Sequence, residues 1–139
     1  MPRPAALLAA AAAAALLGGC TQATTTNNST ANFKGEQRLV ANTVEDLQSA
    51  GAKGDQGTIC RQLLARDLVV RIARGATCER RVDAALKDTD TFDLTVQSVA
   101  LAGTTATARV KTENGAKDKI ATLGLLKEAG RWKISDLGR

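Results

Sequence analysis

The chain has 139 residues, a length that fits one domain and leaves no room for a multidomain enzyme. It carries 19 Lys and Arg against 14 Asp and Glu, for a formal net charge of +5, and it contains no His. The absence of His removes the commonest general base and most zinc chemistry. Aromatic residues make up only 2% of the chain, and the apolar residues outside the Ala- and Leu-only segment 5–17 are enough for one modest core.

The beginning of the chain predicts an export signal rather than a folded element. Arg3 supplies a basic start, and residues 5–17 are only Ala and Leu. Thirteen apolar residues are too few to span a membrane, which takes about 20. They match the apolar region of a secretory signal. We therefore assign residues 1–19 to a signal peptide.

The sequence Leu17-Gly18-Gly19-Cys20 that ends this segment resembles the lipobox of bacterial lipoproteins. The resemblance implies cleavage before Cys20, lipid on its sulfur and anchoring on the extracytoplasmic face of the cell membrane. Two or more acyl chains anchor a protein stably, whereas one is marginal. The alternative is an ordinary signal peptide cut near Gly19, with Cys20 incidental.

Residues 20–31 come next and are rich in Thr and Asn, without a charged or large apolar side chain after Cys20. Such a segment cannot bury enough surface to offset its ordering entropy. We expect a flexible tether that spans roughly 15–20 Å. Residues 32–139 would then form the folded domain.

Three helical segments are predicted next. Residues 32–53 carry apolar side chains at steps of three and four, and glycines follow. A second helix is expected to begin near Thr58 and to run through Ile72 to a stop at Gly75. The third covers residues 77–87.

Cys60 and Cys78 are the two cysteines that remain if Cys20 carries lipid. An even remainder in an exported chain favours a disulfide. The bond would stabilise the domain by about 3 kcal/mol for a loop of this length. Two free buried thiols, or a redox or metal role, are the alternatives.

Beyond residue 90 the apolar period changes from helical to alternating, which predicts four antiparallel strands. Phe92 begins the first strand, and a change of phase near Gln97 and Ser98 indicates a bulge. Gly103, Asn114-Gly115 and Ala129-Gly130 mark the turns. Helices followed by an antiparallel sheet give an α+β layer fold.

This order of elements resembles the NTF2-like (SnoaL-like, cystatin-like) superfamily, and in particular small actinobacterial lipoproteins within it. The resemblance covers about residues 33–137 and implies helices packed on a bent four-stranded antiparallel sheet. The chain lacks the Tyr, His and pocket aromatics that the superfamily's enzymes use, so the resemblance implies a fold and no active site. The residues that carry it are Gly54-Asp55, Cys60, Leu63-Leu64, Cys78, 96–107 around Gly103, and Gly130-Arg131-Trp132-Lys133-Ile134.

Two clusters of charged residues have a structural and a functional interpretation. Asp88, Asp90 and Asp93 lie at a helix-to-strand turn, but the Gly and distal Glu of a calcium loop are missing, so we expect no metal. Arg66, Arg71 and Arg74 lie on the polar side of the second helix. They form either a solvated face or a contact surface for anionic headgroups or envelope polymers.

Two positions on the third strand predict an interface. If Ala121, Leu123 and Leu125 face the helices, Ile120 and Leu126 face away from them. Exposed apolar positions on a sheet often mark a contact with another chain. Trp132, on the last strand, is expected in the core.

Together these features predict a membrane-anchored cell-envelope lipoprotein with a non-catalytic interaction or accessory domain. Its expected partners are the membrane, through the anchor, and a second copy or another envelope protein. We expect no nucleic acid, cofactor or catalytic residue. The alternatives are binding of a small apolar ligand in the cone between sheet and helices, or a lyase or isomerase of the superfamily.

Overall fold

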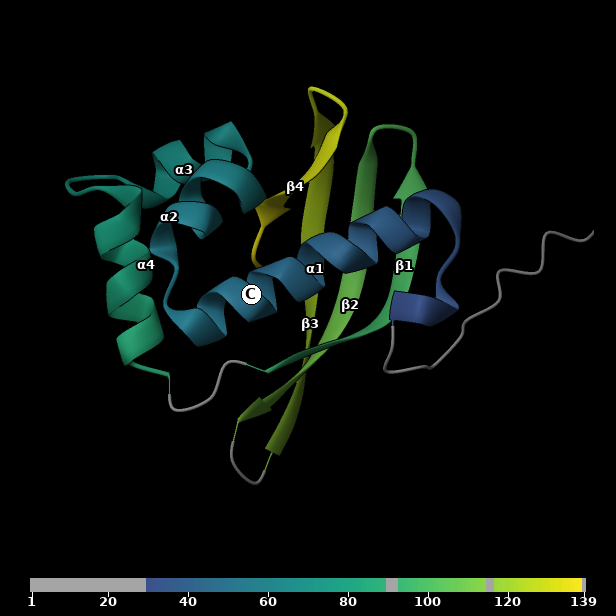
Figure 1. The fold of residues 1–139 in the computed structure, drawn as a ribbon, viewed down its shortest axis with the longest axis horizontal. Helices are drawn as coiled ribbons and strands as arrows, with labels where there is room; N and C mark the ends of the chain where they lie inside the picture. Colours follow the sequence, from purple (N-terminus) through teal and green to yellow (C-terminus); the bar gives the residue numbers. More distant parts are fainter. Residues whose placement is uncertain (1–29, 90–92, 115–116, 139) are drawn as a thin grey trace, which may run out of the picture.

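The computed structural model describes residues 30–89, 93–114 and 117–138. It has two layers, with helices packed on one face of a four-stranded antiparallel sheet (Figure 1). The predicted α+β class is confirmed. The signal peptide, the lipobox and most of the tether lie outside the described residues, as do Phe92 and Asp90. Within the described ranges, no helix combines the length and apolar character needed to cross a membrane.

One long helix and a group of short ones make up the helical layer. The long helix, α1, has its apolar residues three and four apart, and it buries Val40, Val44 and Leu47 against the sheet. It ends at Gly54, whose φ of 65° is readily adopted only by glycine. The helical elements are the 3₁₀ turn η1 (Thr30–Asn32), α1 (Gly35–Lys53), α2 (Gln56–Thr58), the π-helical turn η2 (Ile59–Leu63), α3 (Arg66–Ile72) and α4 (Cys78–Lys87).

The prediction of one helix from Thr58 to Ile72 is wrong. The chain is extended at Leu64 and Ala65, which separates η2 from α3. Leu64 forms a parallel bridge with Ile134 of the last strand, and the Ala65 N–H donates to the Ile134 carbonyl at 2.8 Å. These backbone contacts to the sheet replace the helical hydrogen bonds that would otherwise continue.

The sheet is a meander of strands in the order β1-β2-β3-β4. The predicted bulge is confirmed, since the register of β1 shifts between Val96 and Ser98. Asn114 pairs with Lys117 across the second hairpin. Ala129, at the third turn, has a φ of 48°, which is unusual for a residue with a side chain. The strands are β1 (Leu94–Ala102), β2 (Thr105–Asn114), β3 (Lys117–Glu128) and β4 (Arg131–Asp136).

The space between α1 and the sheet is filled by apolar side chains. Five of them are essentially inaccessible to solvent: Val40, Val44, Val110, Leu125 and Ile134. Among the described residues, Thr43 is the only buried polar one, and its hydroxyl donates to the Leu39 carbonyl at 3.0 Å. Among the described residues, the interior is therefore an apolar core without a buried titratable side chain.

Candidate functional sites

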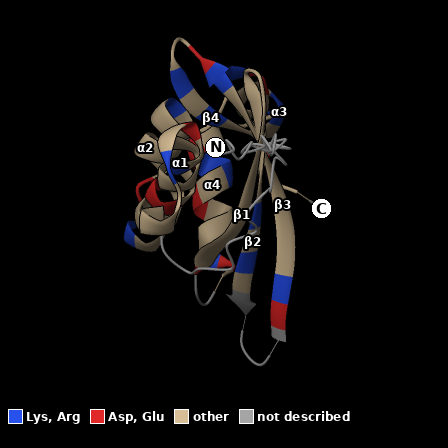
Figure 2. Cartoon of the chain, turned by 90° about the vertical axis from the view of Figure 1, so that its right-hand side faces the viewer, with Lys and Arg blue, Asp and Glu red and all other residues tan. Residues whose placement is uncertain are grey.

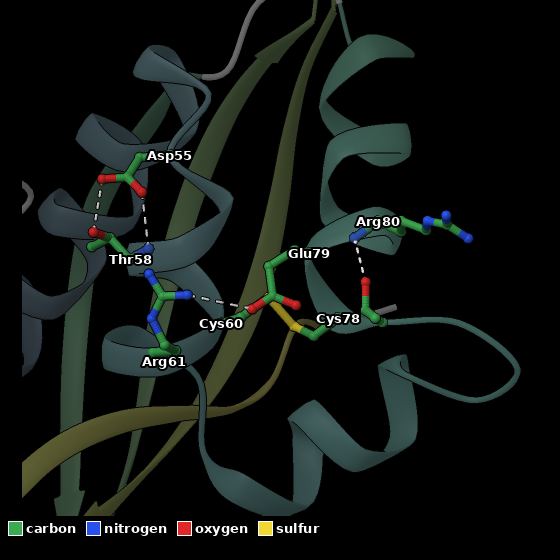
Figure 3. Close-up of polar contacts among 8 residues, drawn as sticks. Asp55, Thr58, Cys60, Arg61, Cys78, Glu79 and Arg80 are labelled. Atoms are coloured by element: carbon green, nitrogen blue, oxygen red, sulfur yellow. Dashed lines mark hydrogen bonds and ion pairs between the residues drawn. A yellow bond between two sulfur atoms is a disulfide. The ribbon is translucent and has the colours of Figure 1, made fainter.

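Cys60 and Cys78 form the predicted disulfide, which joins η2 to the first residue of α4 (Figure 3). The S–S distance is 2.04 Å, and both cysteines are buried. The bond connects two short helical elements. Its position inside the group formed by α2, η2, α3 and α4, which we call the helical lobe, indicates a structural role.

Polar contacts around the disulfide also close the ends of short helices. The Asp55 carboxylate accepts from the Thr58 N–H at 2.9 Å and from the Thr58 hydroxyl at 2.7 Å, and these bonds lower the pKa of Asp55 (Figure 3). The Thr77 hydroxyl accepts from the Arg80 N–H at 3.2 Å, which caps α4. The charged groups in these contacts are thus used to hold the lobe together.

Trp132 lies in the core as predicted, and its indole edge meets a charged pair that the sequence did not reveal. The indole Nε1–H donates to the Glu36 carboxylate at 2.6 Å, and the Lys127 ammonium lies 2.9 Å from that carboxylate. The same ammonium lies 5.6 Å from the centre of the indole ring. The hydrogen bonds from Lys127 and Trp132 lower the pKa of Glu36. This cluster attaches the first turn of α1 to the hairpin of β3 and β4.

A groove beside Trp132 is large enough for a small ligand. We call it the Trp groove; it measures about 300 Å³ and lies between α1, η2 and the β3–β4 turn. Leu39 is half exposed along it, whereas the Trp132 ring is almost covered. Asp46 and Arg131 place opposite charges in its lining. This mixed lining resembles that of small-molecule sites, which combine apolar surface with a few polar groups.

A second groove, which we call the α3 groove, lies beside α3 where the ends of β3 and β4 meet the lobe. It measures about 360 Å³. Its lining includes three cations and several apolar side chains, among them Arg61, Leu64, Arg66, Val69, Val70 and Lys133. Glu128 also lies there, with one carboxylate oxygen accepting from the Arg66 N–H at 3.1 Å.

The three arginines predicted as an anionic contact surface are exposed, but they lie in different settings. Arg66 lines the α3 groove. The Arg71 guanidinium donates to the Ser135 carbonyl at 2.7 Å, so this side chain attaches α3 to β4. Arg74 lies in the turn after α3, where its carbonyl accepts from Arg81. The structure therefore leaves Arg66 as the arginine of this set that faces a groove.

Two of the three residues of the acidic cluster, Asp88 and Asp93, lie in the described part of the chain. Asp88 ends α4, and the Asp93 carboxylate accepts from the Gln48 amide at 2.9 Å. A hollow of about 200 Å³ lies there, lined in part by Glu45 and Asp93. Across residues 30–89, 93–114 and 117–138, no three metal-ligating side chains come together.

The predicted interface residues lie on the sheet face that the helices leave uncovered. Ile120 is 49% exposed, and Leu126 is half-buried on the same face. Their cross-strand neighbours on that face are Lys111 and Thr105 of β2. The central length of β3 carries no charged residue (Figure 2).

Comparison with known families gives one match. The family model described as "Putative lumazine-binding" matches residues 35–136, almost the whole described domain. This family has the NTF2-like, SnoaL-like fold, in agreement with the helices and antiparallel sheet seen here. No curated protein matches the chain significantly.

Proposed function

The chain belongs to this NTF2-like family, and we propose that it is a membrane-anchored cell-envelope lipoprotein whose domain is a non-catalytic interaction module. One observation carries the non-catalytic part. The interior between α1 and the sheet is packed with apolar side chains, and Thr43 is the only buried polar residue among those described. A catalytic acid or base needs a titratable group placed in a cleft against the substrate. The buried interior offers no such group, and Glu45 and Asp93, the carboxylates that line the hollow between α1 and β1, are exposed to solvent. The domain would therefore act through its surface.

The groups whose pKa is shifted support the same conclusion. Hydrogen bonds lower the pKa values of Glu36, Asp55 and Asp83, and the bond to Asp83 raises the pKa of Lys87. These bonds cap α2, join α1 to the sheet, or join two turns of α4. Perturbed pKa values mark functional sites only when the groups also face a cleft. Here they stabilise structure.

The membrane anchor in this proposal rests on the lipobox-like sequence at Cys20. Native mass spectrometry of the protein extracted from its own membranes in mild detergent tests it. We expect a covalent mass that corresponds to a chain beginning at Cys20 and carrying acyl groups. The Cys20→Ser variant is the matched control and should be released from the membrane fraction. An unlipidated wild-type chain would overturn the proposal.

Binding of a small ligand is the second candidate function, and the family match favours it. We place the ligand in the Trp groove rather than in the cone, because apolar side chains pack the interior and half-exposed Leu39 lies near the Asp46 and Arg131 charges. In the same spectra, a retained small molecule that is lost in Leu39→Glu would support this function. Absence of any adduct, with the anchor intact, would favour the interaction module.

The uncovered sheet face is a candidate contact surface of the interaction module. We propose that Ile120 and Leu126 contribute to a contact with a second copy or another envelope protein. Leu126→Glu should lower the mass of the assembly in solution, while Leu101→Glu, an exposed position on β1, should leave it unchanged. A monomer before and after the substitution would contradict the homodimer.

A further inference from the structure

We propose that the α3 groove binds an acidic peptide segment of a protein partner, with its cations taking the carboxylates and its apolar floor taking an aliphatic side chain. This inference deepens the proposed interaction module and rests on it for the choice of partner. It names a surface other than the sheet face that carries Ile120 and Leu126.

The charge of the groove is the first argument. Among the described residues that line it, the cations are Arg61, Arg66 and Lys133, and the one acidic residue is Glu128. Glu79 pairs with Arg61 at 3.6 Å, and one carboxylate oxygen of Glu128 accepts from the backbone of Arg66. The Arg66 side chain forms no ion pair within the described chain, which leaves its guanidinium available to a carboxylate. Arginine binds carboxylates in a planar, bidentate geometry.

Apolar exposure beside these cations is the second argument. Val70 is 65% exposed, the highest fraction among the large exposed apolar side chains of the described chain. It lies one helical turn after Arg66, so the two side chains share a face of α3. Leu64 and Val69 continue the apolar surface into the groove. A purely ionic polymer would leave this surface unused, whereas a peptide with both acidic and aliphatic side chains would cover it.

The position of the α3 groove on the molecule favours a protein partner over the lipids of the membrane that anchors the chain. The described chain begins at η1, beside β1, at the opposite end of the longest axis from α3 (Figure 1). Cys20 precedes Thr30 by ten residues, and the predicted tether of that length would span roughly 15–20 Å. An anchor at Cys20 would therefore hold the η1 end near the bilayer, and the α3 groove would face the aqueous space. Anionic lipid of the anchoring membrane would be at the wrong end.

A direct binding measurement tests this proposal on the full chain purified from its own membranes in neutral detergent. The probe is a labelled, Glu-rich peptide with Leu at every third position, and the control peptide has Gln in place of Glu. We expect saturable binding of the acidic peptide that weakens as salt is added, because exposed charges are screened. The control peptide should bind more weakly, by roughly tenfold.

Matched variants show whether the α3 groove is the site that binds the acidic peptide. Arg66→Glu should weaken peptide binding roughly tenfold, because an attraction is lost and a repulsion is gained. Arg109→Glu makes the same change of charge at an exposed position on the outer face of β2 and should leave binding unchanged. Val70→Ser should weaken binding roughly threefold without altering its salt dependence.

Three outcomes would overturn the proposal: no binding of the acidic peptide, equal losses in Arg66→Glu and Arg109→Glu, or retained peptide binding in Arg66→Glu with a loss of binding to phosphatidylglycerol vesicles. The last would assign the groove to a membrane. Mass measurement on the same preparation separates the two levels. A lipidated chain that does not bind the peptide refutes only the groove, and an unlipidated chain that binds it refutes only the anchor.

Discussion

Two parts of the molecule are held together by different means. One is the layer in which α1 packs on the sheet, and the other is the helical lobe. In the first, a helix of 19 residues lies across long strands, and five large side chains are essentially inaccessible to solvent. In the lobe, four short helical elements bury fewer apolar residues and are joined by a disulfide, helix caps and contacts to β4. The first part is stabilised by burial of apolar area, whereas the second depends on individual connections.

This difference has a consequence for function. Apolar side chains pack the space between α1 and the sheet, and this packing commits the side chains of one sheet face to the core. The lobe buries few side chains in a core of its own, and its arginines and Val70 are exposed. Surfaces of recognition are therefore expected on the lobe and on the uncovered sheet face, rather than between the layers.

The largest effect is expected from a cavity in the core layer. Leu125 is 1% exposed, and Leu125→Ala should lower the free energy of unfolding by about 3 kcal/mol, since a buried side chain is lost and a void remains. Urea titration measures it. Leu101→Ala, at a 41% exposed position of the same sheet, is the control and should cost less than about 1 kcal/mol. Equal losses would show that the interior is not tightly packed.

Removing the disulfide tests the lobe by the same measurement, the free energy of unfolding. The double variant Cys60→Ala and Cys78→Ala should lose about 3 kcal/mol, because the unfolded chain regains the freedom of the closed loop. Amide exchange should rise in α3 and α4 before it rises in α1. Reduction of the wild-type protein should reproduce the loss. Uniform exchange throughout the domain would contradict the separate dependence of the lobe on this bond.

A single cap should have a smaller effect in the lobe. Thr77→Ala removes the acceptor for the Arg80 N–H at the start of α4 and should cost about 1 kcal/mol. Thr77→Ser keeps the hydroxyl and should be within a few tenths of a kcal/mol of the wild type. Thermal unfolding of the three proteins checks this, and equal losses in both variants would exclude the cap.

The turn between β3 and β4 offers a gain in stability. Ala129 and Gly130 have φ values of 48° and 78°, the left-handed conformations that Asn-Gly turns adopt most easily. Ala129→Asn should therefore raise the free energy of unfolding by about 0.5 kcal/mol. Ala129→Val should lower it, because a branched side chain is strained at positive φ. Chemical denaturation distinguishes the two signs.

The smallest effect concerns the link between α1 and the hairpin. The pKa of Glu36 is lower in the folded protein, so its ionised form contributes stability above its unfolded pKa. That contribution is lost as the pH falls through the folded pKa, which lies below 4.5. Glu36→Gln should flatten the acid limb of the stability profile, and Trp132→Phe, which lacks the indole donor, should flatten it less. An unchanged acid limb in Glu36→Gln would refute the ionic link.

Local patterns predicted much of this architecture. Alternation of apolar residues placed the strands, and a change of phase placed the bulge between Val96 and Ser98. Glycine and the spacing of apolar residues placed the end of α1, and cysteine content indicated the Cys60–Cys78 bond. Each of these features is written within a few residues of sequence or in the composition, and the same local rules carry the expectation of a lipid anchor at Cys20.

Contacts between distant segments decided the rest. The break at Leu64 and Ala65 depends on Ile134, about 70 residues away, because backbone pairing with the sheet outweighs local helical preference. The cluster of Glu36 and Trp132 joins residues 96 positions apart, and no local pattern marks Glu36 as a partner. Whether the interior is hollow depends on how side chains from both layers interlock. Sequence alone thus determined most of the elements and their order. Only tertiary packing decided where the second predicted helix breaks and that Arg66 and Val70 share an open groove.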